Sequence, residues 1–373
     1  MKKIYLDNAA TTPIRQEVID EMVIVMQSEY GNPSSTHSIG RGSKAIIESS
    51  RKIIAKHLNC SAQEIIFTAS ATEATNWILR CCIKDLGIKR IITSKIEHHA
   101  TLYTIHALLK EFDIKVDYIN ILSNGNLDYA HFESLFDNDE KTLVSLMHVN
   151  NEIGVINDIQ RIGEWCHQHQ AVFHCDTVQS IGKTRFDLQK LPVDFLVSSA
   201  HKFHGPKGVG FAFLTKKIGL KPMLFGGEQE KGLRAGTEAV HQIAGLSKAL
   251  DMSFQNIDKE ANYIKEIKEY CWQQLKENFP KIQQNGENTL YNILNVLLPF
   301  SAEKTAMILF NLDMKGIAVS RGSACQSGSI KPSHVLAEML NENDIKKPSL
   351  RISFSHYNTK KEVDVFIEEL KRI

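Results

Sequence analysis

Short apolar runs rich in β-branched and aromatic residues alternate with helical patterns between about residues 60 and 215. The runs lie at 65–68, 90–93, 116–119, 143–147, 172–175, 195–197 and 210–214. Apolar positions repeat every 3.6 residues in the intervening segments, most clearly at 73–86, 102–112 and 159–169. This alternation predicts an α/β fold with a mostly parallel, seven-stranded sheet.

A second pattern begins at about residue 258. A long charged helix is predicted at 259–277, closed by Pro280, followed by strands at 291–298, 317–320 and 350–354 and a final helix at 359–373. These elements predict a smaller α/β domain at the C-terminal end. A chain of 373 residues is long for a single core, which also favours two domains.

Charge and cysteine content narrow the class of protein. With 44 basic and 43 acidic residues, the chain lacks the electropositive character of a nucleic-acid binder, which favours a small-molecule substrate. Seven irregularly spaced cysteines are typical of reduced thiols rather than of a disulfide framework. Asp7 and Asn8 interrupt the N-terminal apolar stretch, so no secretory segment is predicted, and no run is long enough to span a bilayer. The predicted compartment is the cytoplasm.

Polar residues follow five of the predicted strands, at 68–73, 94–99, 148–152, 176–179 and 199–202. In open α/β sheets, ligands bind at the carboxyl ends of the strands. These segments are therefore the candidates for a binding site. Whether they meet in one cleft is not decided by their order along the chain.

Lys202 follows the predicted strand at 195–197 in a segment rich in hydroxyl, imidazole and glycine groups. Burial and nearby positive charge lower the pKa of a lysine, and the resulting amine can form a Schiff base with a carbonyl cofactor. Ser199 and Lys202 also match the Ser-x-x-Lys pattern of serine acyl enzymes, but the companion motifs of those enzymes are absent. We therefore favour the Schiff base.

Two other strand ends suggest partners for such a cofactor. The segment 68–73 joins a strand to a helix and is either a phosphate-binding turn or a plain N-cap by Ser70 or Thr72. Asp176 is either the partner of a protonated pyridine nitrogen, as pyridoxal phosphate requires, or an ordinary capping residue. A metal site from the nearby histidines and Asp176 is disfavoured, because no ligand spacing such as His-Glu-x-x-His occurs. No metal is predicted.

Cys325 lies in a Gly- and Ser-rich loop at 316–329, with Arg321 nearby. Positive charge favours the thiolate, which is the reactive form of cysteine. The other six cysteines fall in predicted helices, strands or element ends, where cysteine is usually a small buried apolar residue. Cys325 is therefore the candidate nucleophile.

Together these segments resemble the cysteine desulfurases of the NifS/IscS type, within the class V aminotransferase family of fold-type I pyridoxal-phosphate enzymes. The resemblance extends over nearly the whole chain and rests on segments 5–13, 31–35, 147–154 and 234–238, the Lys202 segment and the Cys325 loop. It implies a large cofactor-binding domain at 15–257. Residues 1–14 and 258–373 would form the small domain that carries Cys325.

The resemblance also implies a role for each matching residue. Lys202 would hold pyridoxal 5'-phosphate as a Schiff base, Asp176 would pair with the ring nitrogen and Gln179 would bond to the phenolic oxygen. His98 would stack on the ring and transfer protons. The remaining contacts implied are Ala71, Thr72, Ser199 and His201 at the phosphate, Thr237 from the partner subunit of a homodimer, Asn151 near the cofactor oxygen and the substrate, and Arg351 at the substrate carboxylate.

The reaction implied is conversion of L-cysteine to L-alanine, with the sulfur held as a persulfide on Cys325 and then passed to a scaffold or tRNA-thiolation protein. The chain stops at Ile373, without the long C-terminal extension that housekeeping members use to dock their scaffold, so the acceptor is not identified. Two alternatives on the same scaffold are a selenocysteine lyase and a class V aminotransferase. A non-catalytic thiol or metal-binding sulfur carrier is a third alternative.

Overall fold

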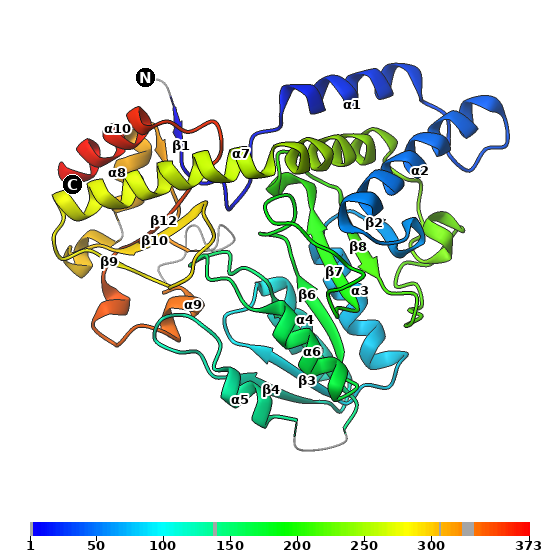
Figure 1. Ribbon diagram of the computed structural model, residues 1–373, viewed down its shortest axis with the longest axis horizontal. Helices are drawn as coiled ribbons and strands as arrows, with labels where there is room; N and C mark the ends of the chain where they lie inside the picture. The colour runs from blue at the N-terminus through cyan, green and yellow to red at the C-terminus, as the bar shows by residue number, and fades with distance from the viewer. Residues whose placement is uncertain (1–2, 137–139, 306, 323–331) are drawn as a thin grey trace.

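The structure is a computed structural model that describes residues 3–136, 140–305, 307–322 and 332–373 (Figure 1). Its helices are α1 Gln16–Ser28, α2 Ser38–Leu58, α3 Ala71–Lys84, α4 His99–Glu111, α5 Tyr129–Ser134, α6 Ile159–Gln168, α7 Val240–Asn278, α8 Ile308–Met314, α9 His334–Ala337 and α10 Lys360–Lys371. Its strands are β1 Ile4–Tyr5, β2 Ile65–Thr68, β3 Arg90–Ser94, β4 Lys115–Ile119, β5 Thr142–Met147, β6 Val172–Asp176, β7 Phe195–Ser199, β8 Gly210–Leu214, β9 Gln283–Gln284, β10 Ile293–Leu297, β11 Ile317–Ala318 and β12 Ser349–Ser353.

Seven strands form the main sheet, in the order β2-β8-β7-β6-β5-β3-β4. β8 is antiparallel to both of its neighbours, whereas the other pairs are parallel. The prediction of a mostly parallel seven-stranded sheet is therefore confirmed. All seven predicted strands are present, and β7 continues beyond its predicted end to Ser199, which brings the polar Ser198 and Ser199 into the sheet.

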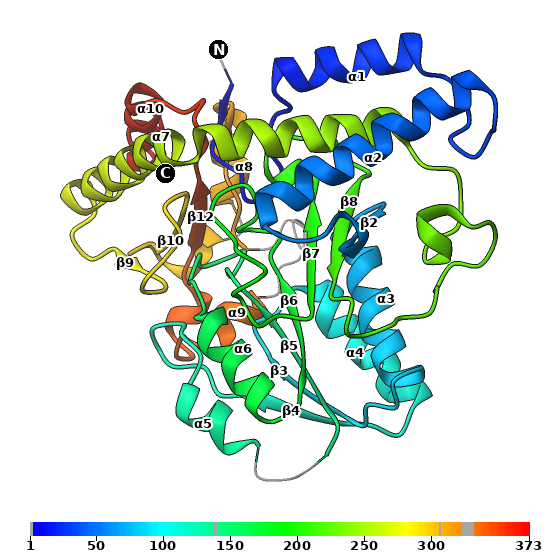
Figure 2. The same ribbon diagram turned by 45° about the vertical axis from the view of Figure 1, so that its right-hand side comes forward.

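Helices cover both faces of this sheet (Figure 2). Ile92 packs in a cluster with residues of α2, α6 and α7, while the adjacent Ile91 packs with residues of α3 and α4. Successive side chains of a strand point to opposite faces, so strands covered on both faces are apolar at most positions. This explains the continuous apolar runs in the sequence.

The long helix predicted at 259–277 is longer than expected. It begins at Val240 and runs without interruption to Asn278. Its first half, including Leu246 and Leu250, packs in the core of the large sheet, and its second half, including Ile267 and Cys271, packs with the small sheet. The change from an apolar to a charged pattern near residue 258 marks a change of packing partner within one helix (Figure 1).

The second core lies around the antiparallel sheet β12-β10-β9 and the parallel pair β1-β11. Leu6 shares this core with Ile264 and Phe366, although these residues lie far apart in the sequence. That packing supports the predicted domain division at residues 14 and 258, which stays a prediction. After β1 the N-terminal segment leaves this core and reaches the large sheet, where the amide of Thr12 donates to the carbonyl of His201 (2.9 Å).

Candidate active site

A cavity of about 230 Å³ lies at the carboxyl ends of the main-sheet strands. Segments that follow β2, β3, β5, β6 and β7 line it, and Ala9, Ala10 and Arg351 close it from the other side. The predicted site residues that line it are Ala71, Thr72, His98, Asn151, Asp176, Gln179, Ser199, His201, Lys202 and Arg351. The structure thus brings together all the polar clusters noted in the sequence.

Lys202 ends a one-turn 3-10 helix, Ala200–Lys202, directly after β7. Its ammonium donates hydrogen bonds to the carbonyl oxygens of Ala9 and Ala10, each at 2.8 Å. These two carbonyls belong to the N-terminal segment, for which the sequence predicted no contact with the lysine. Only the turn from β7 and the crossing of that segment place them together.

Asp176 is the last residue of β6 and is 8 % exposed. Its Oδ1 accepts from the amide of Val178 (2.9 Å). Burial raises the pKa of Asp176 to about 6, while the Val178 hydrogen bond and the charge of Lys202 act in the opposite direction. Glu97 is more deeply buried, which raises its pKa to about 8, and the charge of Asp176 adds to that rise. An additional positive charge in the cavity would favour the ionised form of Asp176.

His98 is the N-cap of α4, where its Nδ1 accepts from the amide of Ala100 (3.1 Å). Because Nδ1 is the acceptor, the proton of the neutral ring resides on Nε2. Burial, and then the charges of Lys202 and His334, lower the pKa of His98 to about 4. The ring is therefore neutral at physiological pH. The helix predicted from residue 102 begins three residues earlier, at His99, because this cap adds a turn.

The N-terminus of α3 faces the cavity through Ala71, Thr72 and Thr75. Ser70 caps the helix by accepting from the amide of Glu73 (3.2 Å), so the capping alternative is correct for Ser70. The amide of Ala71 donates to Ser199 Oγ (2.8 Å). A helix N-terminus beside a hydroxyl is well suited to an anion, so the capping role does not exclude phosphate binding.

Gln179 lines the cavity and has a side-chain oxygen without a hydrogen-bond donor among the described residues. Its Nε2 donates to the carbonyl of Ala9 (2.9 Å), but its Oε1 is buried and has no hydrogen-bond partner within the described part of the chain. A buried oxygen without a donor is unfavourable by about 1–3 kcal/mol. A hydroxyl-bearing ligand in the cavity would satisfy it.

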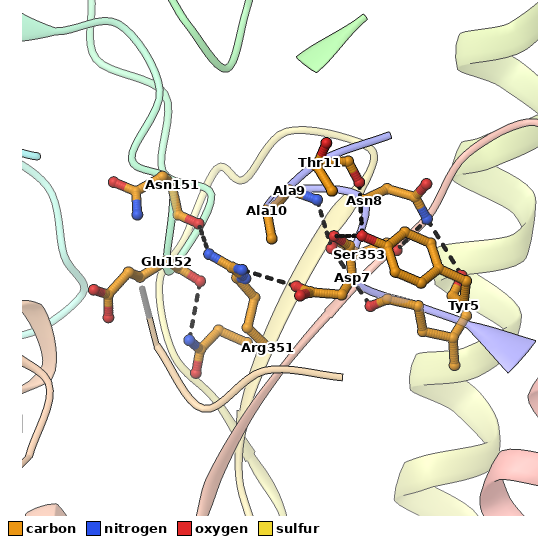
Figure 3. A network of polar contacts seen from close by, with 12 residues as sticks. Tyr5, Asp7, Asn8, Ala9, Ala10, Thr11, Asn151, Glu152, Arg351 and Ser353 are labelled. Carbon is orange, nitrogen blue, oxygen red and sulfur yellow. Dashed lines mark hydrogen bonds and ion pairs between the residues drawn. The ribbon is translucent and has the colours of Figure 1, made fainter. Parts of the chain in front are cut away.

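Arg351, in β12, is 1 % exposed and forms a network with the N-terminal segment (Figure 3). Its Nη1 donates to the carbonyl of Asn151 and its Nη2 to Asp7 Oδ1, each at 2.8 Å. Asp7 is thus a neighbour of the site that the sequence analysis did not single out. Its position in the segment 5–13 was the only signal.

Two predicted site residues lie apart from the cavity or outside the described residues. Thr237 is exposed and lines a separate hollow of about 200 Å³ with Arg234 and Gly236. Cys325 belongs to 323–331, which the structure does not describe. Described residues on both sides of 323–331 approach one carboxylate: Ser333 Oγ donates to Glu152 Oε2, and a Cβ added to Gly322 would lie 3.0 Å from the same oxygen. Glu152 directly follows Asn151, which lines the cavity.

None of the six described cysteines forms a disulfide. Five are buried and Cys60 is partly buried. Burial raises the pKa of Cys60 to about 12 and also raises that of Cys82, Cys166 and Cys175. These thiols are protonated at neutral pH and unsuited to nucleophilic attack.

Within the described residues, no group of three or more histidine, cysteine or acidic side chains is arranged to hold a metal ion. Across the same residues, no helix combines the length and the apolar character needed to cross a bilayer.

The buried and half-buried histidines predict how stability depends on pH. Burial lowers the folded-state pKa of seven of them to about 3 or 4: His98, His99, His148, His174, His201, His204 and His356. Below pH 6.5 the unfolded chain binds more protons at these sites, so the free energy of unfolding decreases as the pH falls. The raised pKa values of Glu97, Asp176, Asp194 and Glu238 act in the opposite sense, but at four sites against seven.

We therefore expect the melting temperature to be several degrees lower at pH 5 than at pH 7, measured by calorimetry at constant ionic strength. A melting temperature that is equal or higher at pH 5 would contradict this expectation.

Comparison with known proteins agrees with this geometry. The family model for Aminotransferase class-V matches residues 4–366. The putative cysteine desulfurase IscS 1 of Bacillus subtilis (strain 168) is 40% identical over 370 residues, which cover 97% of this chain and 96% of that protein. A solved structure described as a NifS-like protein superposes with a TM-score of 0.91 at 34% identity, covering 100% of this chain and 99% of that one. Another, described as SspA in complex with cysteine, has a TM-score of 0.83 at 29% identity and covers 96% of this chain and 100% of that one.

Two observations identify the family. The family model and full-length relatives match the chain, and the sheet, the lysine and the buried aspartate have the fold-type I arrangement. The chain belongs to the class V aminotransferase family, among its IscS and NifS-like members.

Proposed function

We propose that the protein is a pyridoxal-phosphate-dependent cysteine desulfurase that converts L-cysteine to L-alanine and retains the sulfur as a persulfide on Cys325. The observation that carries this proposal is the cavity in which Lys202, Asp176 and the N-terminus of α3 meet. An amine, a buried carboxylate and an anion-binding helix end are the three groups that this cofactor requires of a protein. The names of the relatives supply the substrate class.

The residues present fit the cofactor. The amides of Ala71 and Thr72, with Ser199 and His201, would bind its phosphate. Asp176 would pair with the ring nitrogen, and Oε1 of Gln179, which has no partner among the described residues, would accept a hydrogen bond from the phenolic hydroxyl. The neutral ring of His98 would lie against the pyridine, with Asn151 near the cofactor oxygen and the substrate. When bound through Lys202, pyridoxal phosphate supplies an electron sink for the substrate Cα.

The chain's own groups would then bind and move protons. Arg351 would bind the substrate carboxylate through its guanidinium fork. When Lys202 is not bonded to the cofactor, its amine is held in the cavity by the carbonyls of Ala9 and Ala10. In that position it would take or return a proton at the substrate Cα. His98 offers a second proton carrier, because its low pKa leaves it neutral.

The Cys325 thiolate would attack the sulfur of the bound cysteine. An S–S bond forms while the C–S bond breaks, and the electron pair of the C–S bond stays on the substrate carbon. Protonation of that carbon gives the methyl group of L-alanine, and the persulfide remains on Cys325. The pKa values of the described cysteines support this assignment, since burial raises that of each thiol cited above.

A homodimer is part of the proposal. Thr237 is exposed and lies outside the cavity lining, so it would complete the phosphate site only from a partner subunit. We propose that the enzyme acts in the cytoplasm and passes its sulfur to an acceptor protein for iron–sulfur cluster or thio-cofactor synthesis. The absence of disulfides among the six described cysteines supports a reducing compartment.

The direct test uses the wild-type protein purified with pyridoxal phosphate. Incubation with L-cysteine and a reductant should release L-alanine and sulfide in equal amounts. Transamination that depends on a keto acid would instead indicate an aminotransferase, and turnover of selenocysteine but not cysteine a selenocysteine lyase. Stoichiometric zinc without cofactor would favour a non-catalytic sulfur carrier.

Replacing Asp176 with asparagine tests the ring-nitrogen assignment. Asparagine keeps the size of the side chain but loses the negative charge that would hold the nitrogen protonated. We expect kcat for alanine formation to fall by about a hundredfold or more, within the range for removal of a proton-transfer or charge-stabilising group. Activity within twofold of wild type, with the cofactor bound, would rule out this role.

A further inference from the structure

Arg351 is already held by two acceptors in the structure (Figure 3). Nη1 donates to the carbonyl of Asn151 and Nη2 to Asp7 Oδ1, both at 2.8 Å, and the two side chains are 1 % and 16 % exposed. Nε of Arg351 is buried and has no hydrogen-bond partner among the residues that the structure describes. The guanidinium thus lines the cavity and has N–H groups beyond the two that bind Asn151 and Asp7.

We propose that Asp7 is a positioning residue for the substrate carboxylate, because it fixes the plane of the Arg351 guanidinium. This inference rests on the proposed function. A guanidinium binds a carboxylate through two parallel N–H groups, which requires its plane to be set in advance. With one acceptor on each Nη, rotation about the last side-chain bonds is blocked, and the remaining N–H groups keep one orientation.

Asp7 is itself fixed from β12. Asp7 pairs with Ser353 in an isolated β-bridge, two residues after Arg351. The amide of Ala9 donates to Ser353 Oγ (2.8 Å), and the hydroxyl of Tyr5 donates to the Asp7 carbonyl (3.1 Å). These bonds hold both members of the ion pair on one rigid framework. The same N-terminal segment supplies the carbonyl of Ala9 that binds Lys202, so it places two groups of the site.

A second ion pair in the chain provides a matched control. Arg15 Nη2 lies 2.8 Å from both carboxylate oxygens of Glu260, and the two side chains are 7 % and 19 % exposed. The burial of this pair and its N–O distance thus resemble those of the Arg351–Asp7 pair, but neither Arg15 nor Glu260 lines the cavity. Disrupting it should affect stability without affecting recognition of a carboxylate.

The test compares L-alanine with ethylamine, which differ only by the carboxylate. Binding of each to the cofactor-loaded protein is titrated through the change in cofactor absorbance, so no turnover is required. In Asp7→Ala we expect the preference for L-alanine over ethylamine to fall by about tenfold, the size of one charge-assisted hydrogen bond. Ethylamine binding should stay within about twofold of wild type on the same scale. KM for L-cysteine should rise by a similar factor of about ten, with kcat changed by less than about threefold.

Asp7→Asn keeps an acceptor oxygen but loses the charge, so we expect the preference to fall by about threefold, less than in Asp7→Ala. In an Arg351→Ala background, Asp7→Ala should cause no further loss, because Asp7 acts through Arg351. Glu260→Ala should lower the melting temperature and leave the preference unchanged.

An Asp7→Ala protein that retains the wild-type preference, or loses affinity for both ligands equally, overturns the proposal. If that variant does not fold, the preference in Asp7→Asn decides: an unchanged ratio overturns the proposal and a ratio reduced by about threefold supports it. Failure of the proposed function is distinguishable, because it would appear as absence of alanine formation from cysteine by the wild-type protein.

Discussion

Lys202→Ala is expected to abolish the yellow colour of the purified protein and to reduce alanine formation by about a thousandfold or more. The covalent link to the cofactor and the proton carrier at the substrate Cα would be lost together. Among the described residues that line the cavity, Lys202 is the one lysine, and its ammonium is held by the Ala9 and Ala10 carbonyls near Asp176. Borohydride reduction followed by peptide mass spectrometry should place the cofactor mass on the Lys202 peptide of the wild type.

Lys183 offers a matched control for this experiment. Burial and then the charge of Lys202 lower the pKa of Lys183 to about 7, so it is also a candidate for a reactive amine. Its Nζ donates to the carbonyl of Gln179 (2.9 Å), and it does not line the cavity. Lys183→Ala should therefore keep the cofactor mass on Lys202. Labelling of Lys183 in the wild type, or colour retained in Lys202→Ala, would refute the assignment.

Cys325→Ala is expected to leave the colour intact and to stop alanine formation. The substrate sulfur would still be bound beside the cofactor, but no thiolate would accept it, and the C–S bond would not break. The measurements are the absorbance of the bound cofactor, the yield of L-alanine and the mass of a persulfide on the Cys325 peptide. We expect the turnover rate to fall by at least about a thousandfold.

Cys60→Ala is the control for Cys325→Ala. Cys60 is the one described cysteine that is partly exposed, and its raised pKa, about 12, leaves it protonated at neutral pH. Replacing it should not change the rate. If Cys325→Ala turned over cysteine at the wild-type rate, the sulfur would have to follow another route, and the persulfide assignment would be wrong.

The alternating patterns predicted all seven strands of the main sheet, because strands covered on both faces form nearly continuous apolar runs. The patterns did not predict where α7 begins. Its first half has the apolar pattern of the large domain, with which it packs, and its second half is charged. A helix that changes packing partner along its length has no single pattern, so its start at Val240 was missed.

The site was predicted from individual residue types at the ends of strands. Lys202 and Asp176 became candidates because ligands bind at the carboxyl ends of parallel strands, although the sequence left Asp176 open as an ordinary capping residue. The capping of α3 and α4 by Ser70 and His98 shows that an ordinary structural role and a site role are compatible at one helix end. The roles of these residues toward the cofactor stay predictions, supported by their positions around one cavity.

The sequence by itself determined the α/β class, the parallel sheet and the residues at its carboxyl edge, because these depend on local periodicity and on residue type. Only the tertiary structure decided that the segment after β1 returns to the cavity, that its carbonyls hold Lys202 and that Asp7 pairs with Arg351, more than three hundred residues away. Such contacts arise from the crossing of distant segments and the burial that follows. Charge burial, which lowers the pKa of His98 and raises that of Asp176, depends on the same packing and leaves no mark in local sequence.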